Sequence, residues 1–201
     1  MLKLILLTVS YLLGSIPFGF LITYGVKGVD IRNFGSGNIG ATNVVRVVSK
    51  PWGILVFLLD FLKGLAGPCL TVYLLGSSAS LIIILSAIFV VCGHNWTIFL
   101  KFKGGKGVAA SLGAITGLAF IFSQLWIALF VSLIIWVVVF HIFKYVSAAS
   151  LTASAAFLIY TWISSLPLEI KFFSVLLFII IAARHKKNIQ SLLAKKENRF
   201  G

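Results

Sequence analysis

Glycine, hydroxyl and amide residues gather in one short stretch of the chain, between Asn33 and Arg46. Glycines let backbone N–H groups turn toward a ligand, and Ser or Asn can cap a helix that follows. A helix N-terminus with an arginine nearby is a natural anion site. The candidate residues are Ser36, Gly37, Asn38, Gly40, Thr42, Asn43 and Arg46. The stretch predicts an anion site, although an interfacial re-entrant turn would use the same residue types.

The same stretch imitates a dinucleotide-binding motif. Gly35, Gly37 and Gly40 match G-x-G-x-x-G, and Asp60 follows about twenty residues later. That motif requires a preceding strand and a βαβ unit, whereas Asp60 lies within an apolar run. A Rossmann dinucleotide-binding fold is therefore excluded.

A second polar stretch surrounds three lysines and several glycines between Gly93 and Ala109. It is not a Walker A loop, because no glycine stands six residues before Lys106. Glycines beside lysines nevertheless suit a loop that holds phosphate, with Lys103, Gly104, Gly105 and Lys106 as candidates. For Lys101 we favour ordinary topological charge. His94 and Asn95 at the end of an apolar run indicate a polar-lined cavity or, alternatively, an interfacial anchor with Trp96.

A third polar stretch follows the last apolar run. In a continuous helix Arg184 and Asn188 lie four residues apart on one face, and His185 and Asn188 lie three apart. The basic residues beyond them are assigned to anionic lipid headgroups. These are Lys186, Lys187, Lys195, Lys196 and Arg199.

The residue inventory excludes several catalytic schemes. Three histidines and four acidic residues give no H-E-x-x-H, no carboxylate dyad and no His-x4-Asp pair, and no G-x-S-x-G elbow occurs. Cys69 and Cys92 lie in apolar runs and support neither a disulfide nor a metal site. No cofactor or metal is expected, so an enzyme of this composition would act by positioning and electrostatic stabilisation. Asp60 and Lys63, three apart in an apolar run, form either a structural ion pair or part of a substrate site.

The composition is that of a polytopic membrane protein. Of 201 residues, 60% are hydrophobic and 10% charged, against about 45–50% and about 25% in soluble domains. The 17 basic residues, against 4 acidic ones, fall in short clusters between apolar runs. A nucleic-acid-binding protein would instead present them on a solvated surface, so that class is excluded.

Charge-free runs and their breaks predict seven membrane spans. These are 4–26, 52–75, about 80–99, two within 107–143 separated near Ser123-Gln124, 146–164 and 167–183. The other breaks fall at Gly76–Ser80 and Ser164–Pro167. The first run lacks an Ala-x-Ala cleavage pattern and is expected to be a retained span.

The basic residues test this span count. All but Lys3, Lys63 and Lys171 fall in connections on one side of the membrane. The positive-inside rule then places the N-terminus outside and the C-terminus in the cytoplasm. The expected fold is an all-α bundle of seven transmembrane helices, residues 1–201, with short interfacial or half helices in the cytoplasmic loops.

The three polar stretches resemble the three motifs of the bacterial acyl-phosphate:glycerol-3-phosphate acyltransferase family, PlsY. The matching segments are Ser36–Asn43 with Arg46, Gly93–Trp96 through Lys103–Gly107, and Ala183–His185 with Asn188-Ile189. Asp60–Gly64 resembles another recurring family segment. One departure is that no arginine stands near Gln190 or Ser191. The resemblance covers the whole chain.

The resemblance implies acyl transfer from acyl phosphate to sn-glycerol 3-phosphate, which yields lysophosphatidic acid and phosphate for phospholipid synthesis. It further implies a multi-pass protein of the cell (inner) membrane with a cytoplasm-facing site, and coupling to an enzyme that makes acyl phosphate. The basic loops suit this chemistry, because both substrates carry phosphate.

Our hypothesis assigns phosphate binding and charge stabilisation to Arg46, Lys103, Lys106 and His185, with Arg184 beside them. Hydrogen bonds that orient the substrates come from Ser36, Asn38, Thr42, Asn43 and Asn188. Gly37, Gly40, Gly104 and Gly105 let the backbone approach, and His94 and Asn95 line the site near the reacting carbonyl. The proton acceptor is left open between His185, His94 and a substrate phosphate.

Two rival classes use similar parts. Broken helices and basic sites also serve a transporter for organic phosphates, although no inverted repeat is evident and the outward connections are nearly bare of polar groups. A purely structural membrane subunit is the weaker alternative.

Overall fold

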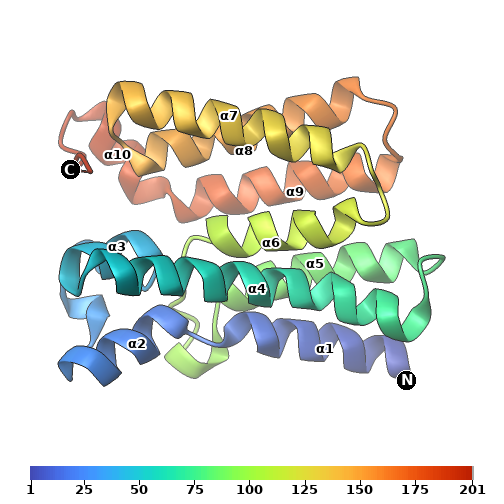
Figure 1. Ribbon diagram of the computed structural model, residues 1–201, viewed down its shortest axis with the longest axis horizontal. Coiled ribbons are helices and arrows are strands. Elements are labelled where there is room, and N and C mark those ends of the chain that lie inside the picture. The colour runs from blue at the N-terminus through green and yellow to red at the C-terminus, as the bar shows by residue number, and fades with distance from the viewer. Residues whose placement is uncertain (201) are drawn as a thin grey trace. The chain divides into compact units, whose positions relative to one another are not determined.

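The computed structural model describes residues 1–200, which contain helices and no strand. The chain forms two compact units, residues 1–118 and residues 119 onward, and each is described by itself. The helices of the first unit are α1 (Leu2–Ser15), α2 (Phe18–Lys27), α3 (Ala41–Val47), α4 (Lys50–Leu75), α5 (Ser80–Asn95) and α6 (Val108–Ala119). Two short 3₁₀ turns, η1 (Ile31–Asn33) and η2 (Ile98–Leu100), lie in its loops. Figure 1 shows that α4 is the long helix of this unit.

The second unit is a helical hairpin extended by two more helices. Its members are α7 (Leu125–Phe143), α8 (Val146–Ile163), α9 (Leu168–Arg184) and α10 (Lys186–Leu193). Helix α8 packs against both α7 and α9, and the short α10 contacts α8 and α9 (Figure 1). A two-residue turn at Lys144-Tyr145 makes α7 and α8 antiparallel neighbours.

The first predicted span agrees in extent with the apolar segment Leu2–Lys27, but this segment is not one continuous helix, because it breaks at Ile16-Pro17 into α1 and α2. A residue before proline is disfavoured in helical geometry, and Ile16 is extended, with ψ 116°. Such a break frees backbone carbonyls, which need partners inside a membrane. Lys63 Nζ donates to the Ile16 carbonyl at 2.7 Å, and Thr97 Oγ1 donates to that of Ser15.

Glycines allow the helices of the first unit to approach closely. A Cβ on Gly14 of α1 would overlap the backbone of Val90 on α5, and one on Gly93 of α5 would overlap that of Tyr11 on α1. Small residues at such crossings are the usual device for packing helices in a bilayer, where burial from lipid adds little driving force.

The same device fixes α6 to α4. A Cβ on Gly64 would overlap the Ala110 carbonyl, and one on Gly113 would overlap the Phe61 carbonyl. The reciprocal pattern leaves no room for side chains between the two helix backbones. It therefore holds the start of α6, and the loop that leads into it, against α4.

Among the described residues, five segments are long and apolar enough to cross a membrane. They are Leu2–Lys27, Lys50–Leu75, Ser80–Leu100, Leu125–Phe143 and Val146–Ile163. Helix α6 has 12 residues and α9 has 17. Large apolar side chains such as Phe130 and Ile142 on α7 are more than half exposed, as expected of a surface that faces lipid.

The other helix breaks lie where the sequence predicted them. Helix α4 ends at Leu75 and α5 begins at Ser80, with Gly76 at φ 75° in the turn. Residues 120–124 separate α6 from α7, and residues 164–167 separate α8 from α9.

Candidate functional site

The first polar stretch forms a loop that is held from within by Asn43. This side chain on α3 is 1% exposed. Its Nδ2 donates to the carbonyls of Phe34 and Asn38 at 3.0 and 2.8 Å, and its Oδ1 accepts from the backbone N–H of Ser36 at 2.9 Å. Because one amide satisfies the backbone on both sides of Gly35-Ser36, Asn43 sets the shape of the loop that presents Ser36.

Short-range turns complete this loop. Asn38 Oδ1 accepts from the Gly40 N–H at 3.1 Å, immediately before α3 begins at Ala41. Gly37 adopts φ 69°, a left-handed conformation that favours glycine. Ser36 and Gly37 are exposed, and Arg46 is exposed in the last turn of α3. Ser36 thus presents its hydroxyl from the loop, and Arg46 presents its guanidinium from the end of the helix that follows.

An ion pair braces the start of the loop. Arg32 Nη2 lies 2.6 Å from Asp30 Oδ2, and the Asp30 carboxylate also accepts from the Arg32 backbone N–H at 2.9 Å. These hydrogen bonds from Arg32 lower the pKa of Asp30 below its usual value. The Arg32 guanidinium also lies over the Phe20 ring at 5.4 Å, which ties the loop to α2. Sequence reasoning did not assign this pair.

The second polar stretch folds back onto the end of α5. The Gly105 N–H donates to the His94 carbonyl at 2.9 Å. A Cβ on Gly105 would overlap the His94 ring, and one on Gly104 would overlap the His94 carbonyl. Gly107, at φ 85°, lies against the Asn95 side chain. The glycine loop (residues 104–107) therefore rests on His94 and Asn95, both buried, and this contact accounts for its glycines.

An apolar cluster joins the first two stretches. Its buried members are Ile31, Ile39, Val44, Val56 and Leu100. Ile39 and Val44 flank the Asn43 loop, whereas Leu100 belongs to η2, just before Lys103. The cluster thereby joins segments that are more than fifty residues apart in the sequence. A substrate site shared by the first two polar stretches requires such a connection.

Behind the glycine loop lies a buried charged cluster of Asp60, Lys63 and His94. Lys63 Nζ is 2.8 Å from Asp60 Oδ1, and His94 Nδ1 is 3.5 Å from the same oxygen. The predicted ion pair between Asp60 and Lys63 is present, but its contact with His94 was not predicted. The sequence offered one signal, namely a charged pair inside an apolar run.

The third polar stretch lies in the second unit and is not the continuous helix that we predicted. Helix α9 ends at Arg184 and α10 begins at Lys186, with His185 between them at φ −96° and ψ 6°. The His185 Nδ1 lies 2.8 Å from the Ile181 carbonyl, and the side chain is 2% exposed. This contact fixes the imidazole at the helix junction, while Arg184 is half-buried beside it.

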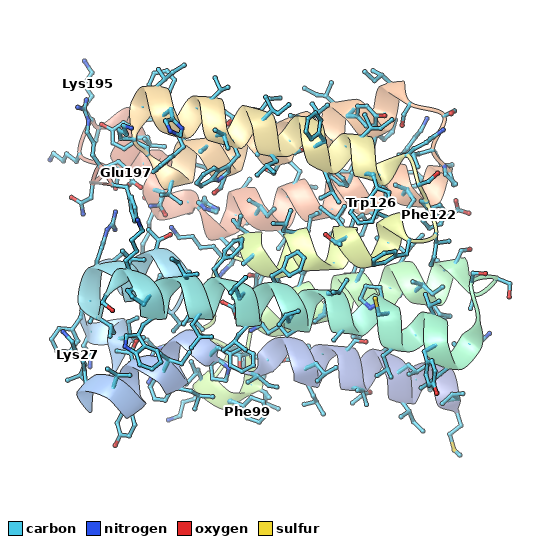
Figure 2. All side chains as sticks on the ribbon, in the orientation of Figure 1. Lys27, Phe99, Phe122, Trp126, Lys195 and Glu197 are labelled. Carbon is cyan, nitrogen blue, oxygen red and sulfur yellow. The ribbon has the colours of Figure 1, made fainter. Side chains whose placement is uncertain are left out.

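Asn188 takes part in a network that the sequence did not indicate. Glu197 Oε1 accepts from Asn188 Nδ2 at 2.6 Å and from Ser147 Oγ at 2.7 Å. Figure 2 shows Glu197 and Lys195 at the left of the view, where Figure 1 marks α10 and the C-terminus. The tail therefore folds back on α8 and α10, and residues assigned only to lipid contact flank a defined polar contact.

Comparison with known proteins decides the family. The family model described as glycerol-3-phosphate acyltransferase matches residues 4–195. The chain belongs to the glycerol-3-phosphate acyltransferase family. The enzyme of that name from Aquifex aeolicus (strain VF5) is 42% identical over 197 residues, which cover 98% of each chain. That from Wolbachia pipientis subsp. Culex pipiens (strain wPip) is 42% identical over 200 residues, again 98% of each.

Crystal structures of PlsY (YgiH), an integral membrane glycerol 3-phosphate acyltransferase, share the fold. The glycerol 3-phosphate form matches with a TM-score of 0.90 and 38% identity, covering 100% of this chain and 96% of that one. The lysophosphatidic acid form matches with a TM-score of 0.87 and 37% identity over the same shares. The chain is thus an integral membrane acyltransferase, as its motifs predicted.

The predicted residues of the first two stretches all lie in the first unit of this acyltransferase. They are Ser36, Gly37, Asn38, Gly40, Thr42, Asn43, Arg46, His94, Asn95, Lys103, Gly104, Gly105 and Lys106. Arg184, His185 and Asn188 gather at the α9–α10 junction of the second unit. Asn43 is buried and bonded within its own loop, so any effect it has on a substrate passes through that loop, whereas Asn95 is buried against Gly107.

Replacing Asn43 by aspartate is expected to disorder the Ser36 loop. The two side chains are nearly isosteric, but a carboxylate would face the carbonyls of Phe34 and Asn38 instead of donating to them. Each buried polar group left unsatisfied costs about 1–3 kcal/mol. We expect a lower thermal unfolding temperature in detergent and a fall in acyltransferase kcat/KM. Retention of both would show that the loop does not depend on Asn43.

Proposed function

We propose that this protein transfers a fatty acyl group from acyl phosphate to sn-glycerol 3-phosphate. The products are 1-acyl-sn-glycerol 3-phosphate (lysophosphatidic acid) and inorganic phosphate, in phospholipid synthesis. One observation carries the proposal. In a chain of this acyltransferase family, a single apolar cluster contains both Leu100, which precedes the glycine loop, and Ile39 and Val44, which flank Asn43. The names of the relatives support glycerol 3-phosphate as the acyl acceptor. The absence of the usual catalytic motifs from the sequence supports an acyl donor that is already activated, such as acyl phosphate.

The donor follows from what the site can do chemically. The acceptor oxygen attacks the acyl carbonyl, the bond from that carbon to the phosphate oxygen breaks, and the hydroxyl proton is carried in the products by hydrogen phosphate. Acyl phosphate is a mixed anhydride, so phosphate is a good leaving group and no covalent enzyme intermediate is needed. Positioning and charge stabilisation are then sufficient.

The proposed roles follow the placement of the side chains. Arg46, Lys103 and Lys106 bind phosphate groups and stabilise the charge that develops on the leaving group. Ser36, which is exposed on the Asn43-held loop, orients a substrate by a hydrogen bond. His185 keeps the phosphate-binding role assigned to it from the sequence. Asn38, Thr42 and Asn188 orient the substrates by hydrogen bonds. Asn43 acts instead through the loop that it holds.

We further propose that residues 1–201 act as one acyltransferase domain with seven spans, including the shorter α6 and α9. The N-terminus would lie outside and the C-terminus in the cytoplasm, in the cell (inner) membrane. The distribution of basic residues supports this orientation. The site would face the cytoplasm, where an enzyme that makes acyl phosphate supplies the donor.

The test uses purified protein in detergent with palmitoyl phosphate and glycerol 3-phosphate. We expect equimolar release of inorganic phosphate and lysophosphatidic acid, and no product when palmitoyl-CoA replaces palmitoyl phosphate. Phosphate release without lysophosphatidic acid would contradict the proposal. So would uptake of glycerol 3-phosphate into proteoliposomes without product, which is the behaviour of a transporter.

A further inference from the structure

The buried cluster of Asp60, Lys63 and His94 contains a third residue beside the ion pair, because both Lys63 and His94 contact Asp60 Oδ1. The three residues are 3, 5 and 4% exposed. Ionisable groups at such positions in a membrane protein are costly and are usually paired or functional. Lys63 is already compensated, because it lies 2.8 Å from Asp60 and donates to the Ile16 carbonyl at 2.7 Å. A purely structural pair would be complete with these two contacts.

The Asp60 carboxylate also contacts helix α5, through His94. Asp60 Oδ1 lies 3.5 Å from His94 Nδ1, which belongs to α5. The other edge of the same imidazole lies against Gly105, where a Cβ would overlap Nε2. The imidazole therefore lies between a carboxylate on α4 and the glycine loop, with one nitrogen toward each.

The backbone of His94 strengthens this connection. Its carbonyl accepts the Gly105 N–H at 2.9 Å, so ring and backbone of one residue support the same turn. The loop runs directly from Lys103 to Lys106, the lysines assigned to substrate phosphate. A small rotation of the imidazole would displace this turn, and a displacement of about 1 Å in a positioned site can cost about 100-fold in rate.

We propose that Asp60 is a positioning residue, which fixes the His94 imidazole and through it the glycine loop that binds a substrate phosphate. This inference rests on the proposed function. It gives His94 a supporting role under the loop instead of that of proton acceptor. Lys63 holds the carboxylate in place and ties it to the break between α1 and α2.

The test compares two double variants, D60N/K63M and D60L/K63M. Both remove the two charges. Asn matches Asp in size, and Leu keeps the branch at Cγ but is larger. Only Asn offers an oxygen that can accept from His94 Nδ1–H. If Asp60 and Lys63 merely stabilise the bundle, the two variants have the same KM values. If Asp60 positions His94, D60L/K63M has a KM for one substrate raised about 10-fold or more relative to D60N/K63M.

Each variant is assayed with palmitoyl phosphate and glycerol 3-phosphate varied in turn, and thermal unfolding is followed in the same detergent. A KM difference between variants that unfold at similar temperatures supports the inference. Equal KM values for both substrates would overturn it. The wild-type protein is assayed alongside: an inactive wild type refutes the proposed function, whereas an active one with indistinguishable variants refutes only the positioning role.

His94→Leu provides the second measurement, should D60L/K63M fail to fold. This substitution leaves the ion pair of Asp60 and Lys63 intact. We expect it to raise the same KM about 10-fold. Where D60L/K63M folds, adding it to His94→Leu should raise that KM no further, because residues acting in series are not additive. A wild-type KM in His94→Leu would overturn the inference.

Discussion

Replacement of Arg46 or Lys106 by alanine is expected to lower kcat/KM by about 10²–10³-fold, the usual cost of removing one group that stabilises developing charge. Arg46 is exposed at the end of α3, and Lys106 is half-buried in the glycine loop. Neither belongs to the apolar cluster that joins the two loops. Folding should therefore persist, as judged by the size-exclusion profile and the thermal unfolding temperature.

Two basic neighbours serve as matched controls. Lys50 begins α4, four residues after Arg46, and Lys101 lies two residues before Lys103; both are exposed. Lys50→Ala and Lys101→Gln each remove one positive charge from the same loops. Because their charge is assigned to topology, we expect kcat/KM within about threefold of wild type. Near-normal turnover in both Arg46→Ala and Lys106→Ala would refute the proposed phosphate ligands.

The helix breaks that the sequence predicted correctly carry local signals. Gly76 adopts φ 75°, and Pro167 directly precedes α9. The break at Pro17 also carries such a signal, but the uninterrupted apolar run concealed it. A hydrophobic run shows that a segment can enter the membrane, and it does not show that the segment is one helix. The partners of the freed carbonyls, Lys63 and Thr97, come from elsewhere in the chain.

The junction at His185 had no local signal at all. Its backbone angles are accessible to any residue, and no glycine or proline marks the end of α9. The contact of Glu197 with Asn188 was equally hidden, because the tail reads as a simple basic extension. Helix propensity along this segment does not reveal such an interruption.

The candidate site residues could be proposed from the sequence because their residue types indicate a chemistry. Glycines, amides and lysines in short stretches indicate phosphate binding whatever the fold. What joins the two stretches is an apolar cluster of residues distant in sequence, to which Leu100, Ile39 and Val44 all belong. The contact between Asp60 and His94 is of the same kind. Such contacts depend on helix crossings, which no spacing within a single segment encodes.

Gly105→Ala is the second change for which we expect a large effect. The added methyl group would overlap the His94 imidazole, which is buried and lies 3.5 Å from the Asp60 carboxylate. The ring has little freedom to yield, so the glycine loop must move instead. Displacing the loop by about 1 Å would misplace Lys106 and cost about 100-fold in kcat/KM.

The control for this change is Gly25→Ala. Gly25 lies in α2 and has no atom within 4 Å of an added Cβ, so alanine there should leave activity intact and slightly favour the helix. Kinetics with both substrates, together with thermal unfolding, separate the two variants. A Gly105→Ala protein that retains wild-type kcat/KM would mean that the loop tolerates displacement from His94. In that case the position of Lys106 in the glycine loop would not depend on His94.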